Sequence, residues 1–79
     1  MDITNAVRER IFELCQRQKI TINKLGTMSG ITQSTLKNIM SGRNGATLIT
    51  LKKICDGLEI GIPEFFNTEE FRNLEQEIK

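Results

Sequence analysis

The 79-residue sequence has no histidine, tryptophan or tyrosine, a single proline and only two cysteines. Without histidine, the usual base partner of a nucleophilic serine or cysteine is missing. Cys15 and Cys55 stand far apart in the chain, whereas a zinc site draws about four ligands from closely spaced cysteines and histidines. We therefore expect no metal, no cofactor and no catalytic residue. We interpret both cysteines as thiols of a hydrophobic core.

Long apolar runs are also missing. None approaches the roughly 18 residues that a membrane-spanning helix needs, and the first five residues lack the basic start and apolar stretch of a signal peptide. The composition, 38% hydrophobic and 27% charged, is typical of an ordered, soluble chain. We expect one small cytoplasmic domain with no membrane partner.

Charge is distributed unevenly along the chain. Residues 20–58 carry five basic side chains and one acidic one, whereas residues 59–79 carry six glutamates and two basic side chains. A basic middle followed by an acidic end is consistent with a polyanion partner at one face. Ordinary scatter of surface charge explains the same numbers, so charge alone leaves both interpretations open.

The spacing of apolar residues predicts an all-α fold of five short helices and a C-terminal helical extension. The first helix should run from about 5 to 18, capped by Asp2 or Thr4. We expect Thr21, Thr32 and Thr47 to cap the second, third and fourth helices, and Gly61 to cap the fifth. Leu48 should lie on the buried stripe of the fourth helix. Asn67 and Glu70 have the spacing of a capping box that would begin the extension.

Residues 21–42 contain two helices of eight or nine residues joined by a short turn at Ser29-Gly30, which is the pattern of a helix-turn-helix. A steep crossing of two helices requires a position without a side chain. Gly26 supplies it, since glycine inside a helix otherwise costs about 1 kcal/mol relative to alanine. We expect Leu25, Ile31, Leu36 and Ile39 to fill the angle between the helices.

This stretch resembles the Xre-type family of phage repressor and Cro-like DNA-binding domains. The matching positions are Thr21, Leu25, Gly26, Ser29 to Thr32, Ser34 to Leu36, Ile39, Gly42, Thr47-Leu48, Leu51, Ile54, Leu58 and Glu64 to Phe66. The resemblance covers roughly residues 5–66 and implies a compact, lambda-repressor-like domain over residues 1–66, with residues 67–79 as an amphipathic extension.

The resemblance also implies which residues contact DNA. The helix at 32–40 would enter the major groove, with Gln33, Ser34, Thr35, Lys37 and Asn38 as candidates for base contact. Gln33 is the strongest of them, because its amide can pair bidentately with adenine. The alternative is that all five form the solvated face of an amphipathic helix; we expect Lys37 and Asn38 to share one exposed side.

Phosphate contacts would come from helix ends and from the loop after the recognition helix. The candidates are Thr21, Ile22, Asn23, Thr32, Arg43 and Asn44. Lys24, Lys52 and Lys53 are weaker candidates, equally explained as surface charges.

The sequence departs from the family pattern at three places. Cys15 and Met40 occupy positions where the family often has a buried arginine–glutamate pair, and an apolar pair there should be no less stable. Glu59 stands where glycine usually follows the fourth helix, and Gly57 comes two residues early. The sequence therefore defines the last residue of that helix only to within about one turn. Gly45-Ala46 replaces the usual proline-containing entry to the fourth helix.

The C-terminal extension is unusually apolar for the end of a small domain. Phe66, Phe71, Leu74 and Ile78 either fold back onto the core or join two copies of the chain. A two-fold dimer would place two recognition helices about 34 Å apart, which suits a palindromic site.

These observations favour a sequence-specific regulator of transcription that binds double-stranded DNA, and we expect a homodimeric repressor of a bacterium or its phage. A regulatory protein partner is compatible with the small size. The alternative is a protein-binding module of the same fold, of the antitoxin or anti-repressor type. An enzyme is disfavoured by the missing histidine and by the small size.

Overall fold

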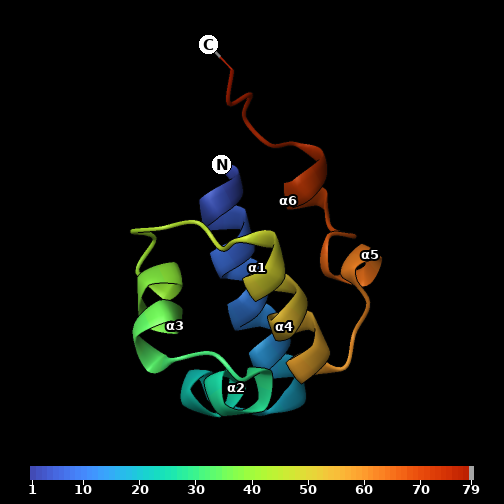
Figure 1. Ribbon diagram of the computed structural model, residues 1–79. Coiled ribbons are helices and arrows are strands. Elements are labelled where there is room, and N and C mark those ends of the chain that lie inside the picture. Colours follow the sequence, from blue (N-terminus) through green and yellow to red (C-terminus); the bar gives the residue numbers. More distant parts are fainter. Residues whose placement is uncertain (79) are drawn as a thin grey trace.

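Six helices carry most of residues 1–78, which are the residues that the computed structural model describes (Figure 1). No strand occurs among these residues, so the all-α prediction is confirmed. In chain order the helices are α1 (Ile3–Gln18), α2 (Ile22–Ser29), α3 (Gln33–Met40), α4 (Leu48–Leu58), α5 (Ile62–Phe65) and α6 (Glu69–Arg72).

The first four helices each begin at a side chain that caps a backbone N–H group. Asp2 accepts a hydrogen bond from Asn5 N at 2.9 Å, so α1 begins two residues before the predicted position. The other caps are those predicted from the sequence: Thr21 accepts from Lys24 N, Thr32 from Thr35 N and Thr47 from Thr50 N, at 3.0–3.1 Å. These bonds satisfy donors that the first turn of a helix leaves without an intrahelical partner.

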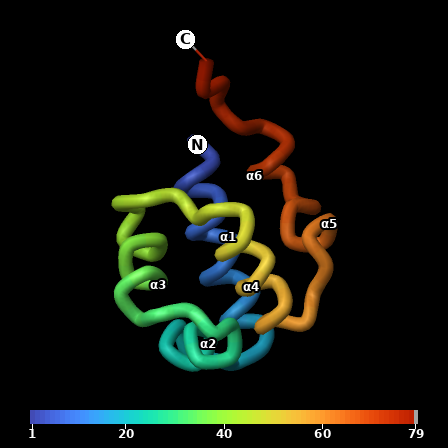
Figure 2. The backbone as a smooth tube through the Cα atoms, in the orientation of Figure 1, coloured from blue at the N-terminus to red at the C-terminus, as the bar shows by residue number. Residues whose placement is uncertain are grey.

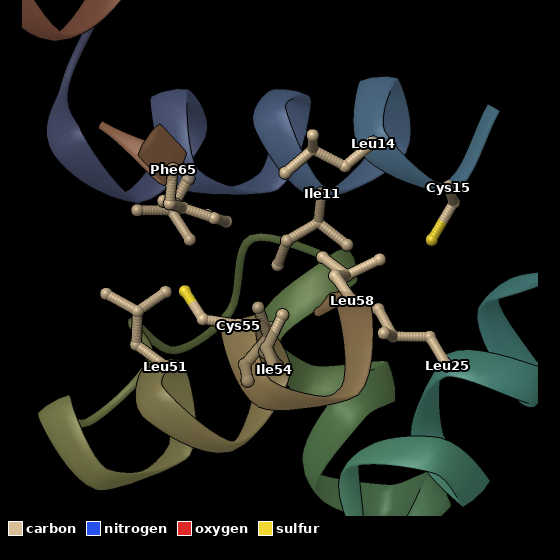
Figure 3. Close-up of a cluster of buried hydrophobic side chains, with 11 residues drawn as sticks. Ile11, Leu14, Cys15, Leu25, Leu51, Ile54, Cys55, Leu58 and Phe65 are labelled. Carbon is tan, nitrogen blue, oxygen red and sulfur yellow. The ribbon is translucent and has the colours of Figure 1, made fainter. Parts of the chain in front are cut away.

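One apolar cluster joins α1, α2, α3, α4 and α5, and Figure 3 shows most of it. Its fully buried members include Ile11, Leu25, Ile54 and Phe65. Cys15 and Cys55 belong to the same cluster as free thiols, and their burial raises the pKa of both. Both are therefore neutral core residues, as predicted.

A buried arginine ties α1 to α5. Arg10 is only 5% exposed, and its guanidinium donates to the backbone oxygens of Phe65 and Glu64, both at 2.8 Å. It also pairs with Glu13 at 2.7 Å, and this hydrogen bond lowers the pKa of the Glu13 carboxyl. The last carbonyls of α5, which lack an intrahelical partner, are thus satisfied from a helix at the other end of the chain.

The end of α4 lies where the family pattern places it, despite the missing glycine. Glu59 itself adopts the left-handed conformation, with φ of 58°, and α4 ends at Leu58. Gly57 is inside the helix for a different reason. A Cβ atom there would lie 2.3 Å from Ser29 Oγ and 3.1 Å from Ser29 N, so α4 and α2 touch at this point.

Leu48 is not part of the core, contrary to the sequence prediction. It is 84% exposed, and its neighbour Ile49 is 73% exposed. As the first residue of α4, Leu48 precedes the turn at which the buried stripe begins with Leu51. Ile62 of α5 is also exposed on the same side of the molecule, where it lines a common groove with both residues.

The predicted capping box at Asn67 is wrong. Thr68 precedes α6 without a capping hydrogen bond, and Asn67 instead accepts a hydrogen bond from Arg72. The extension contains only one short helix, in which Phe71 packs against Phe65 and Phe66, with ring centroids 6.0 and 4.7 Å away. Beyond it, residues 73–78 run past the N-terminus and away from α3 (Figure 2).

Candidate nucleic-acid interface

The turn between α2 and α3 sets the angle of the two helices. Gly30 ends α2 in the left-handed conformation with φ of 69°, which glycine adopts without steric penalty. Ile31 N then bonds to Gly26 O at 3.2 Å. The chain leaves α2 in a new direction, and α3 begins after Thr32 at one side of the molecule (Figure 1).

Gly26 is the point of closest approach between the two helices. A Cβ atom on it would lie 2.8 Å from Gln33 Nε2 and 3.2 Å from Leu36 Cδ2. The Gln33 side chain therefore crosses α2 directly above Gly26, and its Nε2 donates to Asn23 O at 3.4 Å. The missing side chain leaves room for this amide as well as for the buried Leu36.

Gln33 and Lys37 border a hollow between α3 and the start of α2. Ile22, Leu36 and Met40 supply its apolar lining, and Asn23 and Ser41 its other polar edges. Both Gln33 and Lys37 are exposed. Met40 reaches this hollow while it also packs against the core, so this position, where the family often has a glutamate, is apolar here.

Thr35 and Asn38 face a second hollow, on the other side of α3. Asn44, Gly45, Ala46 and Thr47 of the following loop and α4 line the rest of it. The expectation that Lys37 and Asn38 share one exposed side is therefore wrong: Lys37 is exposed, whereas Asn38 is half-buried under the loop. Consecutive residues of a helix are about 100° apart, which places the two on different sides. Ser34 is exposed.

The N-terminus of α2 points its first N–H groups outward. Thr21 Oγ1 accepts a hydrogen bond from Lys24 N. The N–H groups of Ile22 and Asn23, the first two residues of α2, have no intrahelical acceptor. Such an end carries partial positive charge and suits an anion. Thr32 is exposed at the start of α3, with its hydroxyl bonded to Thr35 Oγ1 at 2.9 Å.

The loop after α3 presents Arg43 and Asn44 to solvent. Its backbone is held in place, because Asn38 O accepts from Arg43 N at 3.1 Å and from Asn44 N at 3.4 Å. The Arg43 side chain is exposed and forms no ion pair with another of residues 1–78. A fixed backbone with an unpaired guanidinium can contact a phosphate without rearranging the loop.

The face formed by α2, α3 and this loop contains basic residues and no acidic ones. Between residues 20 and 47, which include α2, α3 and the loop after it, the charged side chains are Lys24, Lys37 and Arg43. The glutamates of α5, α6 and the segment after them lie at the other side of the molecule, and they do not cover α3 (Figure 1). The face can therefore approach a polyanion unhindered.

Two other kinds of site find no support in residues 1–78. None of the helices there combines the length and the apolarity that crossing a bilayer requires. The same residues contain no group of three or more cysteines and carboxylates arranged to hold a metal ion.

Comparison with known proteins bears on this face directly. Residues 11–65 match a helix-turn-helix family, and no curated protein matches the chain. A solved structure described as "Crystal structure of the prophage Lp1 protein 11" is similar to this chain with a TM-score of 0.83 and 32% sequence identity. The similarity covers 94% of this chain and 100% of that one.

Proposed function

This chain belongs to the Xre/Cro-like helix-turn-helix family of DNA-binding regulators, and we propose that it is a transcriptional repressor that binds a palindromic DNA site as a homodimer. The observation that carries the proposal is the uncovered α3. Its polar residues stand beside the N-terminus of α2 and an unpaired Arg43, on a face without acidic side chains.

Base contacts come first from Gln33 in this proposal. Its Nε2 keeps one hydrogen for a base while the other is shared with Asn23 O, and its Oε1 remains an acceptor. Such an amide can pair with the N6 and N7 atoms of adenine in the major groove. Ser34, Thr35 and Lys37 are exposed and add contacts, with Lys37 on one side of α3 and Thr35 on the other. Asn38 is half-buried and contributes only if the loop beside it moves.

Phosphate contacts flank the recognition helix. The N–H groups of Thr21, Ile22 and Asn23 bind one phosphate at the helix end, with Thr32 beside them, and Arg43 and Asn44 bind the backbone beyond α3. These contacts fix the position of α3 without reading the base sequence. The same geometry supports a repressor role, since a bound dimer would occupy a promoter without further machinery.

Selection of binding sites from a random DNA pool tests the proposal. We expect a two-fold symmetric consensus. Gln33→Ala should then lower affinity for the selected site by about 1–3 kcal/mol and relax preference at one base pair. An equal loss on random DNA would remove Gln33 from the base-reading residues.

The salt dependence of binding separates DNA binding from the alternative function, a protein-binding module of the same fold. Arg43→Ala should weaken binding to every sequence and reduce the slope of log affinity against log salt by about one unit. Arg72→Ala is the matched control, because it removes an exposed arginine from α6, away from the interface. A chain that enriches no sequence and binds DNA without salt dependence would instead belong to the protein-binding class.

A further inference from the structure

An apolar groove between α4 and α5 is an exposed hydrophobic feature that the DNA-binding face leaves unexplained. Leu48, Ile49, Ile62 and Phe66 line it together with Lys52 and Lys53, and we call these six residues the α4–α5 patch. Leu48 and Ile49 are among the most exposed apolar side chains of residues 1–78. A contiguous apolar surface with a charged edge is typical of a protein-interaction site.

The edge of this patch is basic. Lys52 pairs with Asp56 along α4, whereas Lys53 forms no ion pair with another of residues 1–78. A partner that fits the patch should therefore combine apolar side chains with carboxylates.

Residues 73–78 of the chain have that composition. They include the apolar residues Leu74 and Ile78, and Glu75 and Glu77 lie between these two in the sequence. If the segment becomes extended on a partner, alternate residues point to opposite sides, with Leu74 and Ile78 on one side and the two glutamates on the other. In the free chain Leu74 is half-buried and the backbone bends at Glu77. Ile78 is 83% exposed, and the segment runs away from the body of the molecule (Figure 2).

The segment does not reach the patch of its own chain. Glu75 N bonds to Met1 O at 3.2 Å, and the Glu75 carboxylate pairs with the N-terminal ammonium at 3.1 Å. This attachment holds the segment beside the start of α1. One molecule thus presents an unfilled apolar groove with a basic edge and, elsewhere, an exposed apolar segment with carboxylates.

We propose that the α4–α5 patch binds residues 73–78 of a second copy of this chain, with Ile78 on Leu48 and Ile49 and with Glu77 beside Lys53. A two-fold dimer makes this contact twice, once with each segment. The inference deepens the homodimer of the proposed function and rests on it. It assigns the dimer contact to an exchange of C-terminal segments and leaves the α2–α3 face open.

Sedimentation equilibrium of the full chain tests the exchange. Ile78→Glu and Ile49→Glu should each raise the dimer dissociation constant by about tenfold or more, because each removes a buried apolar contact. Phe12→Glu is the control, since it changes an exposed apolar residue of α1 outside the patch, and it should leave the constant unchanged. Loss of the dimer in Ile49→Glu but not in Ile78→Glu would overturn the exchange in favour of a direct contact between two patches.

Charge reversal provides an independent test. Lys53→Glu and Glu77→Lys should each weaken the dimer by about two- to fivefold, and the double variant should restore it. Absence of restoration contradicts the pairing of these two residues. Binding of a single half-site DNA separates this inference from the proposed function. An unaltered chain that is monomeric and still binds the half-site overturns only the exchange, whereas an unaltered chain that does not bind it overturns the function. The Ile49→Glu and Ile78→Glu monomers should still bind the half-site.

Discussion

Helix α2 touches two other helices through glycine, and the two contacts differ in what the missing side chain accommodates. At Gly57, the neighbouring atoms include the backbone of Ser29, which cannot move without shifting α2. At Gly26, the nearest atom is the end of the Gln33 side chain, which can rotate. The first contact therefore holds the fold together, while the second positions a residue that we propose to read DNA.

The largest effect should follow from Gly57→Ala. The added methyl group would lie 2.3 Å from Ser29 Oγ and 3.1 Å from Ser29 N, so α4 and α2 must separate. We expect a loss of about 1–3 kcal/mol in the free energy of unfolding, more than the gain in helix propensity offsets. Urea denaturation measures it. Adding Ser29→Ala should recover part of the lost stability, because it removes Ser29 Oγ, the atom nearest to the added methyl group. Unchanged stability of Gly57→Ala alone would contradict the close contact between α2 and α4.

A smaller effect, confined to DNA, should follow from Gly26→Ala. The methyl group displaces the Gln33 amide and presses on Leu36, while alanine favours the helix by about 1 kcal/mol. We expect the free energy of unfolding to change by less than about 1 kcal/mol. Preference for the selected site over random DNA should fall toward that of Gln33→Ala, as measured by competition binding. If Gly26→Ala lost stability but kept its preference for the selected DNA site, the contact at Gly26 would be structural, like the contact at Gly57.

The smallest effects concern helix ends at which no neighbour interferes. Lys19 and Glu59 end α1 and α4 with φ of 57° and 58°, a conformation that disfavours side chains. We expect Lys19→Gly and Glu59→Gly each to stabilise the protein by up to about 1 kcal/mol. The gain is reduced by the larger conformational entropy that glycine gives the unfolded chain. Gly30→Ala should have the opposite sign, because φ is 69° there and no atom lies within 4 Å of an added Cβ. Thermal unfolding of the three variants compares them; a loss of stability in both glycine variants would contradict strain at these ends.

Capping residues and apolar spacing predicted the fold well, because both act within one or two turns of a helix. Thr21, Thr32 and Thr47 cap the helices that the sequence assigned to them. Gly57 misled the sequence interpretation, since its role depends on Ser29 of a distant helix. Glu59 shows that a residue other than glycine can end a helix in the left-handed conformation when the core fixes the chain on both sides.

The candidate site was predicted less completely than the fold. The sequence interpretation placed Lys37 and Asn38 on one exposed side, because it did not reveal that the loop after α3 partly covers Asn38. Burial of Arg10 also escaped prediction, although its position on the apolar stripe, between Val7 and Leu14, was a signal. Contacts between segments far apart in sequence decide both features.

Arg10, near the N-terminus, depends on residues near the C-terminus for its backbone hydrogen bonds. Its guanidinium finds its backbone acceptors at Glu64 and Phe65, so a chain that lacks these residues leaves Arg10 with its Glu13 partner but without either backbone oxygen. We therefore expect a chain that ends before α5 to be less stable than the full chain.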